Sequence, residues 1–147
     1  MIYFVLPVPP SVNAAYRIAR GRRVKTRAAS DWAMHARGEV ERQMGGRAAI
    51  GHACLLIVNV ERGHAVSRED VDNRLKLLQD ALVAGAAIRD DSLIAGLAAA
   101  WAPPGTRTAR LALVPAEPFL LEFHPAKSHA AAGGWIIPAA QPQEEAA

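Results

Sequence analysis

The sequence predicts one small domain of the α/β class, on the basis of its length, its apolar content and the order of its segments. The chain has 147 residues, and a single core commonly takes about 100–150 residues. Apolar residues make up 51% of the chain, which is enough for a core without disulfide staples. Short β-rich runs alternate with two segments of helical periodicity, so strands and helices are expected to share that core.

The first half of the chain is predicted to contain a strand, a turn and a helix. Residues 3–8 are apolar and rich in β-formers, and Pro9-Pro10 ends them as a strand. Gly21 permits a tight reversal in the basic segment that follows. Ser30 is the expected N-cap of a helix over residues 31–44, which a pair of glycines ends.

The second half is predicted to contain three strands and one helix. Residues 52–60 are a β-rich run, and further strands are expected at 92–101 and 108–114, on either side of a Pro-Pro-Gly turn. Residues 71–84 carry one apolar stripe, which predicts a helix with one buried face that Gly85 closes. The stripe recurs at i, i+4, i+7 and i+11 and consists of Val71, Leu75, Leu78 and Leu82.

The end of the chain differs from the rest in composition. After Phe123 it consists largely of Ala, Gly, Pro, Gln and Glu, from which no core can be built. We therefore expect a domain over residues 1–124 and a poorly ordered tail over 125–147. The sequence leaves open whether the apolar residues 135–137 dock on the domain or on a partner.

Composition excludes several classes of protein. Cys54 is the one cysteine, so we expect no disulfide within the monomer, no zinc site built on cysteines, and a reducing compartment. The N-terminus lacks the pattern of a signal peptide, and no apolar run approaches the roughly 18 residues that span a bilayer. Phosphate-binding glycine loops and the Gly-x-Ser-x-Gly motif are absent. We expect a cytoplasmic protein without membrane association.

Positive charge is concentrated near the start of the chain. The net charge is +3 at pH 7, yet residues 1–27 contain no acidic residue. A basic arm followed by an acidic cluster fits a protein that grips a polyanion and acts on it with a metal. A solvated loop whose charges only keep the protein soluble fits equally well, and charge alone leaves both open. The basic residues of this segment are Arg17, Arg20, Arg22, Arg23, Lys25 and Arg27.

Acidic residues gather around the second predicted helix. Asp70 and Asp72 lie at its start, and Lys76 follows Asp72 by four residues, so these two project from one side. The chain reverses after the helix, and we expect the return to bring Asp91 alongside both aspartates. Two carboxylates 4 Å apart repel by roughly 4 kcal/mol at an effective dielectric of 20 unless a hard cation such as Mg²⁺ or Mn²⁺ binds them. Such a cluster is typical of phosphodiester hydrolysis, with the lysine stabilising negative charge.

Each of these features also has an ordinary structural interpretation. Aspartates at a helix start favour the helix dipole by about 0.3–1 kcal/mol each, and residues 67–70 resemble a capping box. Lys76 lies four residues from both Asp72 and Asp80, which fits a surface ion-pair ladder. A double aspartate before a strand is common in turns. Spacing alone leaves both interpretations open.

Two motifs of the chain resemble those of one family, the RusA crossover-junction endodeoxyribonucleases. The acidic segment resembles that family's signature at Asp70-Val71-Asp72-Asn73-x-x-Lys76, Asp80-Ala81-Leu82, Gly85 and Asp90-Asp91. The opening of the chain is similar to the family's at Leu6-Pro7-x-Pro9-Pro10-Ser11-x-Asn13, Tyr16-Arg17 and Gly21-Arg22. The resemblance covers residues 3–123, and its two motifs occur far apart and in the expected order.

This resemblance implies a fold, an assembly and an activity. The fold implied is a small α/β (α+β) domain with a mixed β-sheet and flanking helices, and the assembly is a homodimer. The activity implied is the Mg²⁺-dependent resolution of four-way (Holliday) DNA junctions by paired symmetric nicks, in DNA recombination and repair, with Mn²⁺ as a possible substitute. Two alternatives stay open: a metal-dependent nuclease of other branched DNA, and a junction-binding or architectural protein that does not cut.

The resemblance also implies roles for individual residues. Asn73 is expected to orient a carboxylate, and Asp90 is the alternate ligand if the register slips by one. Glu69 lies where family members often carry basic residues, so the placement of DNA is expected to differ there. The metal ligands implied are Asp70, Asp72 and Asp91, and the catalytic residues are these three with Lys76. The DNA-binding residues expected are Asn13, Tyr16, Arg17, Arg20, Arg22, Arg23 and Lys25.

Overall fold

The structure is a computed structural model that confirms the predicted α+β class. The residues it describes are 1–62, 70–116, 122–124 and 134–136. Contacts divide the chain into two units, Met1–Pro115 and Ala116–Ala147. The described part of the first unit contains a four-stranded mixed sheet, a two-stranded sheet and three α-helices. Among the described residues, no helix has the length and apolar character needed to cross a membrane.

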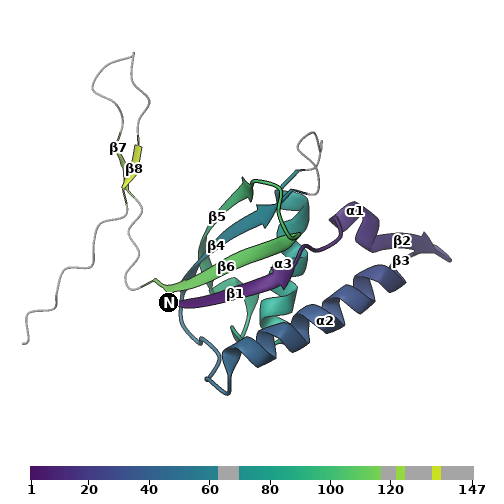
Figure 1. Ribbon diagram of the computed structural model, residues 1–147, viewed down its shortest axis with the longest axis horizontal. Coiled ribbons are helices and arrows are strands. Elements are labelled where there is room, and N and C mark those ends of the chain that lie inside the picture. The colour runs from purple at the N-terminus through teal and green to yellow at the C-terminus, as the bar shows by residue number, and fades with distance from the viewer. Residues whose placement is uncertain (63–69, 117–121, 125–133, 137–147) are drawn as a thin grey trace, which may run out of the picture. The chain divides into compact units, whose positions relative to one another are not determined.

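The four-stranded sheet forms the centre of the first unit (Figure 1). Its strands, in spatial order, are β1 (Ile2–Pro7), β6 (Thr108–Pro115), β4 (Cys54–Glu61) and β5 (Ile94–Ala102). β6 pairs antiparallel with both β1 and β4, whereas β5 runs parallel to β4. A parallel neighbour requires a crossover connection, and the helix between β4 and β5 provides it. This crossover carries the predicted acidic residues.

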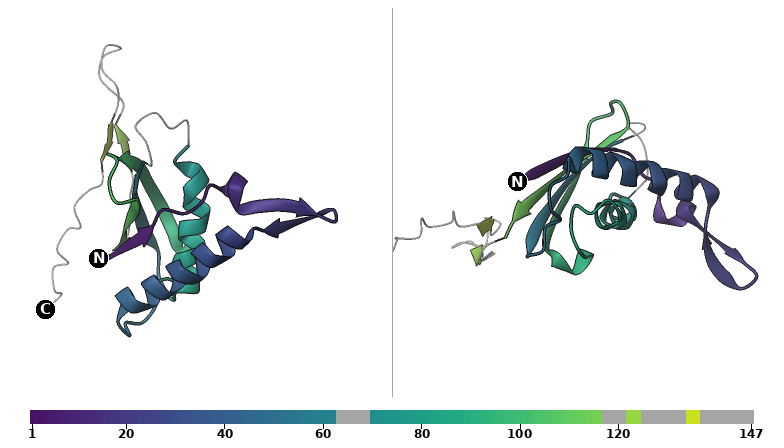
Figure 2. Two further views of the ribbon diagram at one scale, coloured as in Figure 1. Left: turned by 45° about the vertical axis from the view of Figure 1, so that its right-hand side comes forward. Right: turned by 90° about the horizontal axis from the view of Figure 1, so that it is seen from below.

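Two long helices lie on one face of this sheet (Figures 1 and 2). They are α2 (Arg27–Met44) and the crossover helix α3 (Asp72–Ala84). A short 3-10 helix, η1 (Asp91–Leu93), follows α3 and leads into β5. Before α2, the chain forms the short helix α1 (Val12–Ala15) and a two-stranded hairpin of β2 (Tyr16–Ala19) and β3 (Arg22–Lys25). This hairpin extends away from the sheet in both views of Figure 2.

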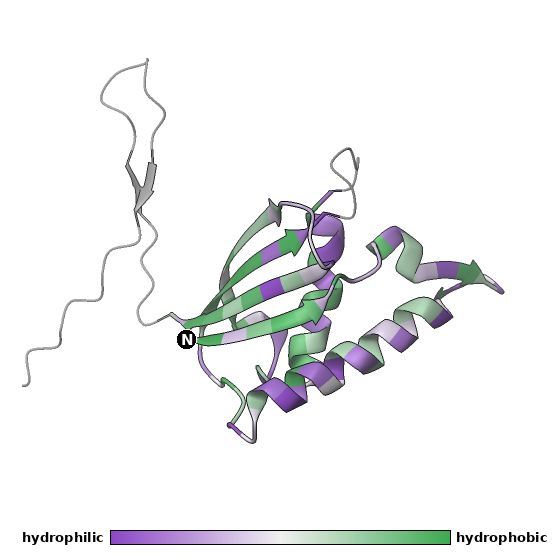
Figure 3. Cartoon of the chain, viewed as in Figure 1, coloured by the Kyte–Doolittle hydropathy of each residue, from purple (hydrophilic) through white to green (hydrophobic). Residues whose placement is uncertain are grey.

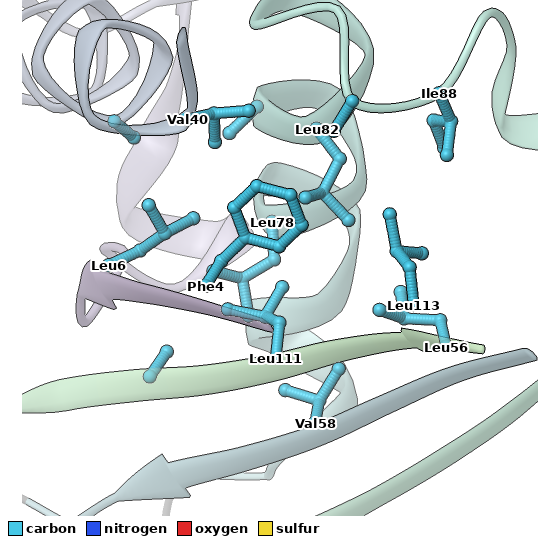
Figure 4. Close-up of a cluster of buried hydrophobic side chains, with 14 of the residues drawn as sticks. Phe4, Leu6, Val40, Leu56, Val58, Leu78, Leu82, Ile88, Leu111 and Leu113 are labelled. Carbon is cyan, nitrogen blue, oxygen red and sulfur yellow. The ribbon is translucent and has the colours of Figure 1, made fainter. Parts of the chain in front are cut away.

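The core fills the space between the sheet and the two helices (Figure 4). Leu78 and Leu82 of α3 are fully buried there, so this part of the predicted apolar stripe is confirmed. Val71 and Leu75 are only partly buried, because the buried side of α3 is turned toward Arg74, Leu77 and Ala81. The large buried side chains that share this core with α3 include Phe4, Leu6, Val40, Leu56, Val58, Ile88, Leu111 and Leu113.

Helix α2 begins four residues earlier than the sequence predicted. Thr26, and not Ser30, is the N-cap, since the Thr26 hydroxyl accepts a hydrogen bond from Ala29 N–H at 3.4 Å. The Thr26 N–H donates to the Ala15 carbonyl at 2.8 Å, and this bond to α1 holds Thr26 in the extended conformation that an N-cap requires. Ser30 lies inside the helix, where its hydroxyl donates to the Thr26 carbonyl at 3.1 Å.

Helix α3 ends after Ala84, as predicted, but for a different physical reason. Gly85 does not adopt the left-handed conformation of a helix C-cap, since its φ is −89°. That conformation falls on Ala86, with φ of 55°. A Cβ atom on Gly85 would lie 2.5 Å from the Val40 side chain, so the glycine permits α2 and α3 to approach closely.

Among the described residues of the first unit, no helix covers the second face of the four-stranded sheet (Figures 1 and 2). The register aligns Tyr3, Ala112, Ile57 and Ala98 in one row across all four strands on this face. Tyr3 and Ile57 are 68% and 37% exposed, and Val5 in the next row is 49% exposed. We call this surface the open face of the sheet.

The second unit contains one described element, a pair of antiparallel strands. β7 (Glu122–His124) pairs with β8 (Gly134–Ile136). The pair spans the predicted boundary between residues 124 and 125. The remainder of the predicted tail, residues 125–133 and 137–147, lies outside the described part of the chain.

Candidate active site

The candidate site begins at the first turn of α3. Asp70 is exposed just before the helix, and Asp72 is its first residue. The N-cap position is Val71, which makes no side-chain cap, and the Asp72 Oδ1 atom accepts a hydrogen bond from Asn73 N–H at 2.9 Å. Negative charge is favoured here by the helix dipole. The capping box expected at this end includes residues 67–69, which are not among the described residues.

Arg74 attaches this turn to the rest of the fold. The residue is only 7% exposed, and its guanidinium donates a hydrogen bond to the carbonyl of Pro9, in the segment after β1. A hydrogen bond from a charged donor is roughly twice as strong as a neutral one. The sequence does not mark Arg74 as a buried residue, because arginines on helices are mostly exposed and its partner lies 65 positions away in the chain. Arg74 therefore positions the helix end that carries Asp72.

Lys76 connects two of the predicted acidic residues. Its Nζ lies 2.7 Å from Asp91 Oδ2 and 2.9 Å from Asp80 Oδ1. The three side chains are 39–56% exposed, so each pair adds at most about 1 kcal/mol to stability. The hydrogen bonds to Asp91, and then to Asp80, raise the pKa of Lys76 above its ordinary value. Lys76 is therefore an ammonium ion at neutral pH, which can stabilise negative charge or donate a proton but cannot act as a general base.

Asp90 and Asp91 differ in what they contact. The Asp90 Oδ1 atom accepts a hydrogen bond from Ser92 N–H at 2.9 Å and caps η1. Hydrogen bonds from Ser92 lower the pKa of Asp90. Asp91 instead faces α3 through Lys76. Asp80, the other partner of Lys76, lies one helical turn further along α3, and Asp91 lines a surface pocket with Asp80 and the last residues of that helix.

A surface pocket lies beside these acidic residues. Its volume is about 430 Å³, within the range of small-ligand sites. Lys25, at the base of the β2–β3 hairpin, shares this pocket with three aspartates, so the basic segment and the acidic residues meet there. The lining residues are Lys25, Asp80, Val83, Ala84, Asp90 and Asp91.

The chemistry of the predicted metal ligands fits a hard divalent cation, but their arrangement does not form a ready site. Carboxylate oxygens are the ligands that Mg²⁺ and Mn²⁺ prefer. Within the described residues, however, no group of three or more His, Cys, Asp or Glu side chains is placed to hold a metal ion. The ammonium of Lys76 lies on the Asp91 carboxylate instead. Of the ordinary interpretations, the Lys76–Asp80 half of the expected ion-pair ladder and the turn at Asp90 are present as well.

The basic segment is an ordered hairpin and not a plain loop. β2 and β3 are joined by Arg20 and Gly21, whose φ angles of 51° and 71° are those of a type I′ turn. The reversal at Gly21 was predicted but the strands were not, because basic residues occupy half of the strand positions. Arg22 opens β3, and the Arg23 guanidinium lies 4.2 Å from the centre of the Tyr16 ring.

Most of the predicted DNA-binding residues surround a second pocket, at this hairpin. Its volume is about 430 Å³, and it contains four of the seven predicted residues. Arg20 lies in the turn, and Lys25 lines the acidic pocket. The predicted DNA-binding residues therefore extend along the hairpin from its outer end to its base. The lining residues of the hairpin pocket are Val12, Asn13, Tyr16, Arg17, Ile18, Gly21 and Arg23.

Glu61 is a buried carboxylate that the sequence did not reveal. It ends β4 and is 5% exposed. Its oxygens accept hydrogen bonds from Thr108 N–H at 3.1 Å and from Arg110 at 3.0 Å. The hydrogen bond from the Thr108 N–H, aided by the charge of Arg110, lowers the pKa of Glu61. We assign Glu61 a structural role in linking β4 to β6, because its carboxylate oxygens already accept hydrogen bonds from residues of β6.

Comparison with known proteins identifies one family. The family model described as Endodeoxyribonuclease RusA matches residues 7–112, which include α1, the β2–β3 hairpin, all of α3 and Asp91. No curated protein matches the chain.

Proposed function

Since the chain belongs to the RusA family of endodeoxyribonucleases, we propose that it resolves four-way (Holliday) DNA junctions in recombination and repair. It would do so by paired, symmetric nicks that depend on Mg²⁺. The observation that carries this proposal is the bond from Lys76 to Asp91, which links the first residue of η1 to the helix that carries Asp72. The family match spans both segments.

The proposed catalytic residues are Asp70, Asp72, Asp91 and Lys76. The three aspartates are the proposed metal ligands, with Asn73 orienting a carboxylate and Asp90 as the alternate ligand. A bound divalent ion would polarise the scissile phosphate. Within the described residues the carboxylates are not placed as a ready group of three ligands, so an ion that bound all of them would have to draw them together.

The proposed role of Lys76 is to stabilise negative charge in the transition state, and its protonation state supports this role. It is a cation at neutral pH, because Asp91 and Asp80 raise its pKa. An ammonium beside the scissile phosphate would stabilise the negative charge that develops in the transition state. Removal of one such preorganised donor commonly lowers kcat by about 10²–10³.

The β2–β3 hairpin is the proposed grip on the DNA backbone. It concentrates arginines without any acidic residue between positions 16 and 25, and it leads directly to the acidic pocket through Lys25. Contacts of this kind fix the register of the DNA without reading its sequence. The proposed residues are Asn13, Tyr16, Arg17, Arg20, Arg22, Arg23 and Lys25.

We propose that the active form is a homodimer acting in the cytoplasm. Paired nicks on two strands require two active sites, and one chain supplies one. Within the described part of the first unit, the open face of the sheet, with Tyr3 and Ile57 exposed, is an apolar surface that a second copy would cover. Sedimentation velocity should give a dimer for the wild type and a monomer for Ile57→Lys, whereas Met34→Lys, on the exposed side of α2, should remain dimeric.

A cleavage assay separates this proposal from the two alternatives. A synthetic four-way junction, a linear duplex and a flap are incubated with the protein in Mg²⁺ or in EDTA. Symmetric nicks confined to the junction, in Mg²⁺ alone, support a resolving enzyme. Cleavage of all three substrates would indicate a general nuclease of branched DNA, and binding without any cut would indicate an architectural protein.

The site assignment is tested by Asp72→Asn. This change removes a charge without altering side-chain shape, so cleavage should be lost while junction binding is retained. Asp31→Asn is the matched control, because Asp31 is an exposed aspartate of α2 far outside the proposed ligand set in sequence. Near wild-type cleavage by Asp72→Asn would show that the assignment is wrong.

A further inference from the structure

An exposed isoleucine lies near the outer end of the basic hairpin. Ile18 is 82% exposed, more than any other large apolar residue in the described part of the chain. It is two positions from the Arg20-Gly21 turn. A type I′ turn matches the twist of the strands that it joins, so the direction in which Ile18 projects is fixed by the hairpin. Figure 3 shows hydrophobic colour within β2 among hydrophilic segments.

The neighbours of Ile18 leave it uncovered. Its partner across the hairpin is Arg23, a side chain long enough to cover an isoleucine with its methylene groups. The Arg23 guanidinium instead lies over the ring of Tyr16, 4.2 Å from its centre, which is nearer the base of the hairpin. Tyr16, Ile18 and Arg23 occupy one face, because side chains alternate along each strand, and all three line the hairpin pocket.

The charge around Ile18 defines the partner as a polyanion. Arg17, Arg20 and Arg22 lie within four residues of it, and no acidic residue occurs before Asp31. Cationic side chains that are this close together bind the phosphates of a nucleic acid and distinguish little between base sequences. An apolar side chain among them contacts something other than phosphate. In nucleic acid the apolar surfaces are the faces of the bases, which become accessible where stacking is interrupted.

We propose that Ile18 inserts at the branch point of a DNA junction and packs against the face of a terminal base pair, while the flanking arginines hold the adjacent phosphates. Apolar side chains that enter continuous duplex must unstack a base step at a cost of a few kcal/mol. That cost is smaller at a branch point, where stacking is already broken. Ile18 would therefore make the hairpin selective for branched over linear DNA. This inference rests on the proposed function.

The test compares Ile18→Thr with Val24→Thr. Both changes keep a β-branched side chain, so the strand propensity of the hairpin is retained. Val24 lies on the opposite face of the same hairpin, paired with Arg17, and is 42% exposed. Binding is measured by fluorescence anisotropy on a four-way junction and on a duplex, and unstacking is measured with 2-aminopurine placed next to the branch point.

The wild type and Val24→Thr should bind the junction equally and raise 2-aminopurine fluorescence on binding. Ile18→Thr should bind the junction about tenfold more weakly, the loss expected for one buried apolar side chain, and should abolish the fluorescence rise. Its affinity for duplex should not change, since the phosphate contacts are intact. Ile18→Val should restore most of the junction affinity and the fluorescence.

The outcomes separate failure of this inference from failure of the proposed function. If Ile18→Thr matches Val24→Thr in affinity and fluorescence while the wild type still cuts junctions, the proposed insertion of Ile18 is wrong. The proposed nuclease activity is then unaffected. An equal loss on junction and duplex also contradicts insertion, since it makes Ile18 a general support of the hairpin. If the wild type does not bind the junction at all, both proposals fall.

Discussion

The body of the first unit and its basic hairpin are stabilised in different ways. In the body, the sheet and the two long helices enclose a continuous core in which Leu78 and Leu82 have no exposed surface. The hairpin consists of two four-residue strands joined by a tight turn, and its Ile18 is almost entirely exposed. Stability therefore resides in the body, and the side chains of the hairpin are free to contact another molecule.

Because of this difference, substitutions in the body should affect stability, and substitutions in the hairpin should affect DNA binding. A change in the body should alter the free energy of unfolding and affect DNA only through the fraction of folded protein. A change on the hairpin should alter DNA binding and leave the free energy of unfolding within about 0.5 kcal/mol, as is usual for exposed positions. Substitutions in each region test this comparison.

The largest effect is expected from Leu78→Ala. Leu78 is fully buried in the core between α3 and the sheet (Figure 4), and truncation of a buried leucine costs about 2–5 kcal/mol through lost burial and a residual cavity. Urea unfolding at constant temperature measures the change. Junction affinity, corrected for the folded fraction, should stay within twofold of wild type. A loss below 1 kcal/mol would contradict the assignment of stability to this core.

The next effect is expected from Arg74→Met, which belongs to the body but touches the site. The change removes the hydrogen bond from Arg74 to the Pro9 carbonyl, and loss of a bond to a charged donor costs roughly 1.5–3 kcal/mol. Because α3 would lose its attachment at the turn that carries Asp72, kcat should also fall in the folded protein. Arg47→Met, at an exposed arginine, should change neither quantity. Normal kcat with lowered stability would limit Arg74 to a structural role.

The body was also the part that the sequence predicted best. Periodic burial signals a strand or helix directly, and the segments that became β1, β4, β6 and α3 all carry it. The strands of the hairpin were not predicted, because each is only four residues long and basic residues occupy half of their positions. Thr26 was missed as the N-cap of α2 because its bond to Ala15 lies eleven positions away.

The site could be predicted in part, for a related reason. The bond from Lys76 to Asp80 is local and follows from helical spacing. The bond from Lys76 to Asp91 depends on the crossover between β4 and β5, which residue spacing alone does not determine. The burial of Arg74 depends on Pro9 in a distant segment. Residue spacing therefore predicted the local contact of the site but not its contacts between distant segments of the chain.

A smaller effect, confined to binding, is expected from Arg22→Gln on the hairpin. Each lost phosphate contact lowers the slope of log affinity against log salt by about 0.9, so junction and duplex binding should weaken together and depend less on salt. Urea unfolding should be unchanged, because Arg22 is exposed. Arg47→Gln removes the same charge from outside the hairpin and should leave the slope intact. An unchanged slope for Arg22→Gln would exclude this arginine from the interface.

The smallest effect is expected from lowering the pH, which should change the stability of the body but not the charge of the hairpin. Residues 16–25 contain no carboxylate, so lowering the pH from neutral leaves the charges of the hairpin unchanged. In the body, the hydrogen bond from Thr108 N–H, aided by Arg110, lowers the pKa of Glu61 from its ordinary 4.5. A depressed folded-state pKa stabilises the fold above the unfolded value and loses that contribution as pH falls through the folded value.

Urea midpoints measured between about pH 7 and pH 3 should therefore fall more steeply for the wild type than for Glu61→Gln, which carries no titrating group at this position. The two proteins should differ most at neutral pH and converge below the ordinary glutamate pKa. Glu41→Gln, at an exposed glutamate of α2, is the control for the loss of a charge and should run parallel to wild type. Parallel curves for wild type and Glu61→Gln would mean that the bonds of Glu61 to β6 do not favour its ionised form. The pairing of β4 with β6 would then be stabilised by its backbone hydrogen bonds and by packing, without a contribution from the charge of Glu61.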